Sequence, residues 1–227
     1  MVFDKTPSGA RRALTRVRAC VARAFLMLCI GMPLAHAATF TVTKTADTND
    51  GVCNADCSLR EAITAANGNG VPDTIAFNIP VADPGYNAGT GVFTITVSSG
   101  LPAITNDGTT IDGTTQTSNV GNTNASVLGA GGTVGVGPDG VIGTGDEQVL
   151  PQVAGPEIEI RDGVGAANGL RVQANNTTIR GLAILGFGGA NGDAGILVDN
   201  NFTGTLIEQN VLGSFAHTFT DPGAALR

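Results

Sequence analysis

Short runs of alternating apolar and polar residues make up most of the chain after residue 38. Residues 39–45 place Phe40 and Val42 on one face and hydroxyls and Lys44 on the other, the alternation typical of a half-buried strand. Further short strands, separated by Gly, Asn, Asp and Pro, are predicted at 73–79, 91–97, 109–112, 157–161, 170–173, 178–185, 195–199 and 206–212. The pattern predicts an all-β fold with many turns.

One segment has helical spacing instead. Ser58 and Glu61 fit a capping box, in which the Ser hydroxyl and the Glu carboxylate each satisfy a free amide at a helix start. The residues that share the apolar face of this helix are Leu59, Ala62, Ile63 and Ala66. Asn67-Gly68 then ends the helix. It is the one helix predicted after residue 38, and its apolar face suits a lid on the open end of a sheet.

Two pairs of segments repeat at a spacing in the twenties. Residues 169–172 match residues 195–198 at an offset of 26, and residues 179–184 match residues 207–212 at an offset of 28. Residues 109–113 also recur as residues 177–181. Such a period is typical of a solenoid whose units stack on one another.

The repeat predicts which side chains stack. The inward residues Leu170, Val172, Ile179 and Ile184 are expected over Ile196, Val198, Ile207 and Leu212, respectively. Outward, solvated positions are expected for Arg171, Gln173, Arg180 and Glu208. Asn210 is expected at a bend of the coil, because Asn tolerates a left-handed backbone.

Residues 114–150 interrupt this pattern. They are rich in Gly, Thr, Asn, Asp and Val, show no stable period, and are interpreted as a Gly-rich excursion from the coils. Asp139, Asp146 and Glu147 lie close together in this excursion and are expected to be solvated.

The first 37 residues read as a signal peptide. A basic leader contains Arg11, Arg12, Arg16, Arg18 and Arg23, an apolar stretch runs over residues 24–34, and Ala35-His36-Ala37 supplies a small-x-small cleavage site. The apolar stretch is too short for a spanning helix, which needs about 20 residues. We therefore expect export, cleavage after Ala37, and no transmembrane segment in the mature chain.

Charge and cysteine usage agree with export. The chain after residue 37 holds 18 acids and six bases, a balance that disfavours nucleic-acid binding. Cys53 and Cys57 are the only cysteines left after cleavage, and an oxidising compartment favours a disulfide between them. Zinc is the rival interpretation, but two thiolates without a nearby His fall short of four ligands.

Residues 57–63, Cys-Ser-Leu-Arg-Glu-Ala-Ile, resemble the motif after which the CSLREA domain is named, and the strand at 39–42 and Cys53 resemble that domain too. The resemblance covers roughly Thr39 to Pro80. It implies an exported bacterial protein of the outer cell surface or the medium, with a right-handed parallel β-helix after an N-terminal module. The expected organisation is a signal peptide at 1–37, a cap module with a short capping helix at 38–90, and β-helix coils at 91–227.

No catalytic residue and no cofactor is predicted, because polysaccharide chemistry on such folds needs clustered acids with Arg or Lys beside them. Asp47, Asn49 and Asp50 are a calcium candidate, although the spacing misses an EF-hand loop and an ordinary Asx-rich turn explains it as well. The expected function is a non-catalytic, adhesin-like or scaffold protein whose partner, a glycan or cell surface, is not identified by sequence. The alternative is a carbohydrate-binding or polysaccharide-cleaving β-helix.

Overall fold

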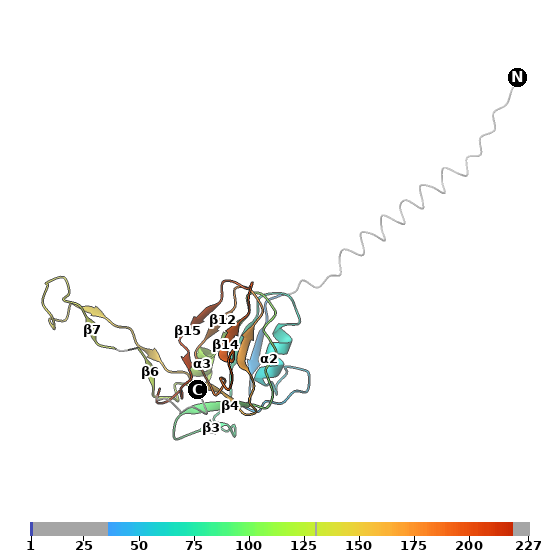
Figure 1. Cartoon of the computed structure of the whole chain (residues 1–227), viewed down its shortest axis with the longest axis horizontal. Helices are drawn as coiled ribbons and strands as arrows, with labels where there is room; N and C mark the ends of the chain where they lie inside the picture. The colour runs from blue at the N-terminus through green and yellow to red at the C-terminus, as the bar shows by residue number, and fades with distance from the viewer. Residues whose placement is uncertain (2–35, 130, 220–227) are drawn as a thin grey trace. The chain divides into compact units, whose positions relative to one another are not determined.

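The computed structural model describes Met1, residues 36–129 and residues 131–219. Contacts divide the chain into two compact units, Met1–His36 and Ala37–Arg227. The expected signal peptide lies almost entirely outside the described residues. The second unit is mostly β-structure with two short helices in its described part, as Figure 1 shows.

The first sheet has the strand order β1-β2-β5-β12-β15. Every pairing in it is parallel. Its strands are β1 (Thr39–Val42), β2 (Thr74–Phe77), β5 (Thr110–Asp112), β12 (Thr178–Arg180) and β15 (Leu206–Glu208).

The second sheet has the order β16-β13-β10-β4-β3. Its strands are β3 (Tyr86–Asn87), β4 (Val92–Val97), β10 (Ile158–Asp162), β13 (Leu182–Leu185) and β16 (Val211–Leu212). Only the β3–β4 pairing in this sheet is antiparallel. A third, two-stranded parallel sheet joins β11 (Asn168–Val172) to β14 (Ala194–Val198).

The chain visits these three sheets in a constant order. From β10 onward it passes through the second, third and first sheets and then repeats the same sequence through β13, β14 and β15. An isolated parallel bridge between Ile104 and Val172 extends the third sheet to the preceding turn of the chain. Parallel neighbours of this kind need long crossovers, and the other two sheets supply the crossover here.

The predicted register of the stacked side chains is confirmed, but Ile207 and Leu212, expected to point inward, are 42% and 52% exposed. Leu170 pairs with Ile196, and Val172 with Val198. In the first sheet Ile179 pairs with Ile207, and in the second sheet Ile184 pairs with Leu212. The shorter echo at residues 109–113 also pairs as expected, since Ile111 lies beside Ile179.

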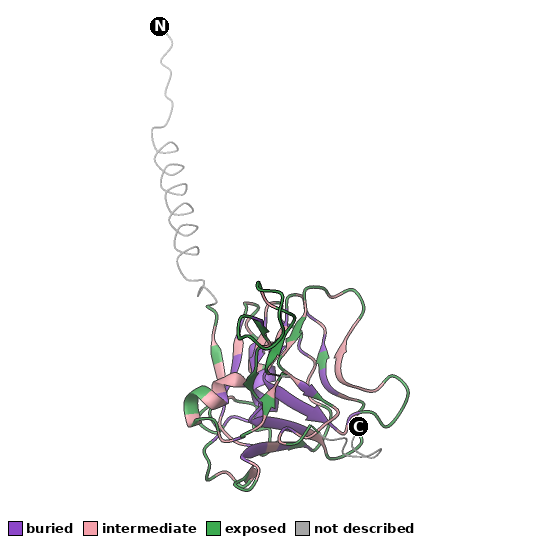
Figure 2. Cartoon of the chain, turned by 90° about the vertical axis from the view of Figure 1, so that its left-hand side faces the viewer, coloured by how far each residue is buried: buried purple, intermediate pink, exposed green. Residues whose placement is uncertain are grey.

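The core consists of aliphatic columns that run across the strands. Ile75, Ile111 and Ile179 form one buried column in the first sheet, and Ile95, Ile160 and Ile184 form another in the second. Figure 2 shows that the buried residues concentrate in these stacked strands. Identical β-branched side chains pack well on top of one another on a pleated surface.

Two of the predicted strands are each broken into two. The segment 178–185 divides at Gly181, which has φ +68°, and the segment 206–212 divides at Gln209, which has φ +55°. Asn210 lies at the second bend, between β15 and β16, as expected, but the left-handed residue of this bend is Gln209. Asn210 instead accepts a hydrogen bond from the Leu182 amide (3.0 Å) and donates one to the Ile179 carbonyl (2.8 Å), so its side chain bridges two neighbouring turns of the chain.

Helix α2 (Leu59–Ala66) forms as the sequence predicts. Its apolar residues Leu59, Ala62, Ile63 and Ala66 are all buried, and the helix packs against β1 and β2. Asn67 is its C-terminal cap. The helix thus covers the core at the end of the first sheet where β1 lies.

The expectation of a single helix was wrong. Helix α3 (Thr114–Val120) opens the excursion, although its Thr, Ser and Asn residues are poor helix formers. Tertiary hydrogen bonds compensate: the Gln116 side chain accepts from the Ile79 amide (2.8 Å) and donates to the Ile79 carbonyl (2.7 Å), and Asn119 donates to the Phe77 carbonyl (2.8 Å). Polar side chains of α3 therefore complete the backbone bonding just after β2.

The rest of the excursion also has regular structure, contrary to expectation. It forms a hairpin built from two short antiparallel pairs, β6 (Val127–Leu128) with β9 (Val153–Ala154) and β7 (Thr133–Val134) with β8 (Gln148–Val149). This hairpin, residues 127–154, leads away from the stacked sheets in Figure 1. We refer to it as the arm.

Candidate functional site

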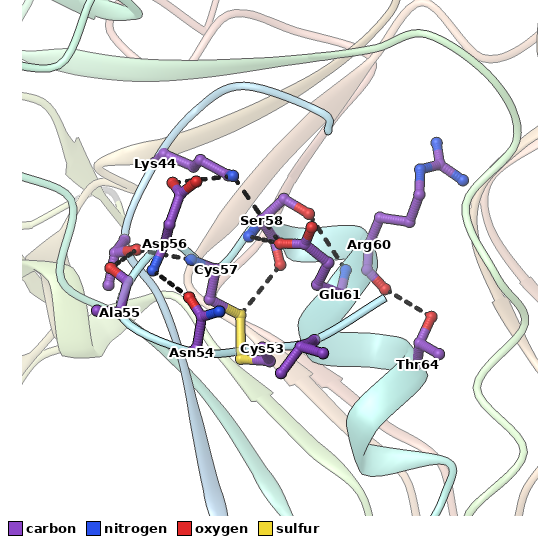
Figure 3. Close-up of a disulfide and its surroundings, with 12 residues drawn as sticks. Lys44, Cys53, Asn54, Ala55, Asp56, Cys57, Ser58, Arg60, Glu61 and Thr64 are labelled. Atoms are coloured by element: carbon purple, nitrogen blue, oxygen red, sulfur yellow. Dashed lines mark hydrogen bonds and ion pairs between the residues drawn. A yellow bond between two sulfur atoms is a disulfide. The ribbon is translucent and has the colours of Figure 1, made fainter. Parts of the chain in front are cut away.

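The strongest local constellation lies at the start of α2. Cys53 and Cys57 form a disulfide with a Cα–Cα distance of 4.5 Å, shown in Figure 3. Directly after it, the Glu61 amide donates to the Ser58 hydroxyl (3.2 Å), and the Ser58 amide donates to the Glu61 carboxylate (2.7 Å). Both halves of the expected capping box are therefore present.

Glu61 also holds the preceding loop. Its side chain is fully buried, and its second carboxylate oxygen accepts the Asp50 amide at 2.8 Å. Burial raises the pKa of Glu61, but the hydrogen bonds from the Ser58 and Asp50 amides outweigh it, so the pKa lies below its usual value. Lys44 Nζ stands 4.0 Å from the same carboxylate and 2.9 Å from Asp56. The ionised Glu61 is thus the common acceptor for the helix start and the loop.

Arg60, the residue before Glu61 on the same helix, connects α2 to the loop at Asp47 and to the turn at residues 99–100. Its guanidinium makes two hydrogen bonds to the Asp47 carboxylate, at 3.0 and 2.7 Å. It also donates to the carbonyls of Ser99 and Gly100, both at 2.8 Å. Such a bidentate, largely buried pair is among the stronger charge-assisted contacts in proteins.

The calcium candidate falls on this constellation. The Asp47 carboxylate accepts the Ser98 amide (2.7 Å) in addition to Arg60. Burial raises the pKa of Asp47, but the bonds from Arg60 and Ser98 outweigh it and the pKa lies below its usual value. Asn49 and Asp50 accept the amides of residues 51 and 52, at 3.1 and 2.9 Å, as in ordinary Asx turns.

The side chains of Asp47, Asn49 and Asp50 are therefore occupied by donors of the protein itself. Within residues 36–129 and 131–219, no three His, Cys, Asp or Glu side chains are grouped so that they could hold a metal ion. A calcium effect on this loop stays a prediction, and the Discussion gives its test.

A second candidate is a pocket that sequence reasoning missed. It has a volume of about 260 Å³ and lies between α3, the turn at Gly181, Gln209 and the segment 153–157. Hydroxyls of Thr114, Thr117 and Ser118 line it together with Glu157. The pocket thus combines hydroxyls and one carboxylate with the apolar residues Val153, Ala154 and Pro156.

Glu157 is the unusual group of this pocket, because it is a buried acid without a basic partner among its hydrogen-bond donors. Its carboxylate accepts the Thr123 and Asn124 amides, at 3.0 and 2.9 Å, and the Thr123 hydroxyl. Burial raises the pKa of Glu157 by more than these hydrogen bonds lower it, so the pKa lies above its usual value. The sequence offered no distinct signal for this burial, because the predicted strand at 157–161 also contains Glu159 and Arg161.

At the tip of the arm, the expectation that Glu147 is solvated was wrong. Glu147 is only 5% exposed, and its carboxylate accepts the amides of Gly143, Thr144 (3.0 Å) and Gly145 (2.9 Å). Hydrogen bonds from these amides, that of Thr144 first, hold the pKa of Glu147 below its usual value. Glu147 therefore shapes the tip of the arm and is not solvated, because consecutive turn amides surround its carboxylate.

Comparison with protein-family models, with curated proteins and with solved structures finds no match to this chain. The resemblance of roughly Thr39 to Pro80 to the CSLREA domain therefore stays a prediction from the sequence. In the part of the chain that the structure describes, no helix has both the length and the apolar character needed to cross a membrane.

Proposed function

We propose that this chain is an exported, non-catalytic right-handed parallel β-helix of the CSLREA-domain type, acting as an adhesin-like or scaffold protein at the cell surface or in the medium. Stacked registers of parallel strands in three sheets support the β-helix part of this proposal. The covering of the first sheet by α2 supports a cap module at its N-terminal end, where an open stack would otherwise expose core and strand edges.

The main support for an adhesive role is the exposed apolar surface of the arm. Seven of its described aliphatic side chains are exposed, and they are Val127, Val134, Val136, Val141, Ile142, Val149 and Val153. The arm contains three acids and no Lys or Arg. Exposed apolar groups gathered on one element mark interaction surfaces more often than scattered ones do, and the bonds of Glu147 give the tip a defined shape.

The charged groups of the stacked sheets support a non-catalytic role. Arg171 forms an ion pair with Asp199 (2.7 Å), and Arg180 forms one with Asp112 (2.6 Å). Groups engaged in this way serve cross-strand pairing.

Export is tested by the N-terminus of the secreted product. The full chain, produced in a bacterium with a general secretory pathway, should appear outside the inner membrane and begin at Ala38 by mass spectrometry. A chain that keeps residues 1–37 and stays in the cytoplasm contradicts the proposal.

The alternative, a carbohydrate-binding or polysaccharide-cleaving protein, is favoured by the pocket at Glu157. A buried carboxylate with a raised pKa is a property of general acids, and hydroxyls around it suit a neutral sugar. Catalysis would need a second group, because glycoside hydrolysis uses paired carboxylates.

A glycan-binding screen beside a polyuronate and neutral-polysaccharide cleavage assay separates the two functions. The proposal expects no turnover by wild type. Turnover that Glu157→Gln abolishes and the surface control Glu208→Gln preserves would replace the proposal by the alternative. Binding without turnover, lost when Ile142 on the arm is changed to Asp and retained in Glu157→Gln, supports the adhesin-like role.

A further inference from the structure

Asp73 is a buried acid that lies directly before β2. It is 2% exposed, and the Ala38 amide donates to its Oδ1 atom at 2.7 Å. The other carboxylate oxygen, Oδ2, is buried and makes no hydrogen bond with the described residues. A buried polar atom without a partner is costly and rare in a native fold. One acceptor of Asp73 is therefore left without a donor.

No Lys or Arg side chain in the described part of the chain supplies that donor. After residue 37, the described Lys and Arg side chains each form an ion pair with an acid other than Asp73, and they are Lys44, Arg60, Arg161, Arg171 and Arg180. Buried carboxylates are ordinarily paired or fully hydrogen-bonded. A positive group for Asp73 therefore has to come from elsewhere in the chain.

The residue that donates to Asp73 is also the first one after the expected cleavage site. Ala37 is exposed and Ala38 is partly buried. Hydrolysis of the bond between them by a signal peptidase consumes one water, and it leaves a carboxylate on Ala37 and an α-amino group on Ala38. This amino group is protonated at neutral pH. Cleavage thus replaces an amide with one N–H donor by an ammonium group with a positive charge and three donors.

The backbone holds Ala38 in place whatever its charge. Its carbonyl accepts the Thr74 amide at 2.9 Å, and Thr39, the next residue, pairs in register with Thr74. Since the Ala38 nitrogen already lies 2.7 Å from Oδ1, an ammonium group at the same position can donate to both oxygens of the carboxylate. Hydrogen bonds between charged groups are shorter and stronger than those between neutral ones.

The other end of β1 depends on export as well. Thr43, which follows β1, donates its amide to the Cys57 carbonyl and accepts the Cys57 amide on its hydroxyl, both at 2.9 Å. Cys57 is held by its disulfide to Cys53, and such a bond persists in an oxidising compartment. β1 contributes the fully buried Val42 to the core and packs against α2. Both attachments of this strand are therefore strengthened by events that accompany export.

We propose that removal of the signal peptide completes the fold, because the new α-ammonium group of Ala38 binds Asp73 as its buried counter-ion. This inference rests on the proposed export of the chain. The precursor keeps a neutral amide at Ala38 and is the less stable form. In the cleaved product the ion pair holds β1 against β2, and with it the cap module.

Melting temperatures of residues 38–227, with the Cys53–Cys57 disulfide intact, test the proposal. The chain is released in vitro from a fusion partner that is cut immediately before Ala38, and half of it is acetylated enzymatically at the α-amino group. The free chain is expected to melt at least about 4 °C above the acetylated chain. In Asp73→Asn the difference should fall to about 1 °C or less. In Asp107→Asn it should persist; Asp107 is the matched control, because it is an exposed aspartate just before the neighbouring strand β5.

The reactivity of the α-amino group gives a second measurement, which needs no substitution at Asp73. An unpaired α-amino group loses its proton near about pH 8 and is therefore acylated by an activated ester at about pH 7. An ammonium group paired with a carboxylate keeps its proton and is not nucleophilic. Mass spectrometry should show that the N-terminus of residues 38–227 is acylated at least about tenfold more slowly than that of residues 37–227. The longer chain is the control, because its amino group belongs to the exposed Ala37.

Three results overturn the proposal. They are equal melting temperatures of the free and acetylated chains, an effect of acetylation that Asp73→Asn retains in full, and equally fast acylation of residues 38–227 and 37–227. Every chain in these measurements is cut in vitro, so none of them depends on secretion. A secreted product that keeps residues 1–37 contradicts the proposed export instead, and the two failures are therefore distinguishable.

Discussion

Replacing Glu61 by alanine should unfold the N-terminal module more severely than any surface substitution of similar size. The change removes the acceptor of the Ser58 and Asp50 amides, bound at 2.7 and 2.8 Å. The Glu61 side chain is fully buried, so water cannot replace the carboxylate without opening the loop. Helix α2 and the loop before it therefore lose the same anchor.

The magnitude follows from the groups left behind. Each of the two amides left without an acceptor costs about 1–3 kcal/mol, and the Ser58 amide is also the lost half of the capping box. Allowing for partial relaxation of the loop, the free energy of unfolding should fall by about 3–5 kcal/mol. Glu61→Gln keeps the volume and one acceptor oxygen, so its cost should be about half as large.

The pH dependence gives an independent check. The pKa of Glu61 is lower in the folded state, so its ionised form stabilises the fold above the unfolded pKa, about 4.3. That contribution is lost as the pH falls through the folded-state pKa. The difference in the free energy of unfolding between wild type and Glu61→Gln should therefore become smaller as the pH is lowered below about 4.

Urea unfolding followed by circular dichroism measures these differences, with the slope m compared between variants. Glu208→Ala is the control, since Glu208 is partly exposed in a 3.8 Å ion pair and should cost about 0.5 kcal/mol or less. The reasoning is refuted if Glu61→Ala is as stable as Glu208→Ala. It is also refuted if the stability difference between wild type and Glu61→Gln becomes larger in acid.

Three further outcomes are expected. The pKa of Glu157 is raised in the folded state, so the stability that the protonated carboxyl contributes is present below about pH 4.3 and is lost as the pH rises through the folded-state pKa. In thermal melts, Glu157→Gln should therefore gain stability relative to wild type between pH 4 and pH 7. A difference in melting temperature between the two that does not change with pH speaks against this. Calcium should raise the melting temperature and protease resistance if residues 47–50 bind it, and a titration that changes neither rules it out. Gly91→Ala should destabilise the protein by more than about 2 kcal/mol, because Gly91 has φ +72° and an added Cβ would lie 1.8 Å from the Thr123 carbonyl oxygen. Gly143→Ala is the control, since Gly143 has φ +85° but open space around it, and it should cost about 1 kcal/mol. Equal urea midpoints for the two variants would contradict the steric account.

Several of the missed features share one cause. Helix α3 has a sequence of poor helix formers, yet Gln116 and Asn119 bond to backbone groups 37 and 42 residues away. The pairing of Arg60 with Asp47 and with the turn at Ser99 spans 13 and 39 residues. Local patterns report the nearest few residues, so bonds over such separations are invisible until the chain is folded.

The sequence by itself determined the strands of the three stacked sheets apart from β3, the capping box and the register of the repeats. Alternation sets which side chains face the core, and the capping box needs only residues 58–61. Identical spacing of aliphatic residues makes one stacked register more favourable than a slip that would turn Ile179 and Ile207 outward.

Only the tertiary structure decided where the core ends and what the polar side chains do. Ile179 and Ile207 occupy the same position in the repeat, yet one is fully buried and the other is 42% exposed, because burial depends on the neighbour across the strand and not on the residue itself. The same holds for Glu157, just before β10, and Glu208, at the end of β15: only the surrounding fold buries the first and leaves the second partly exposed.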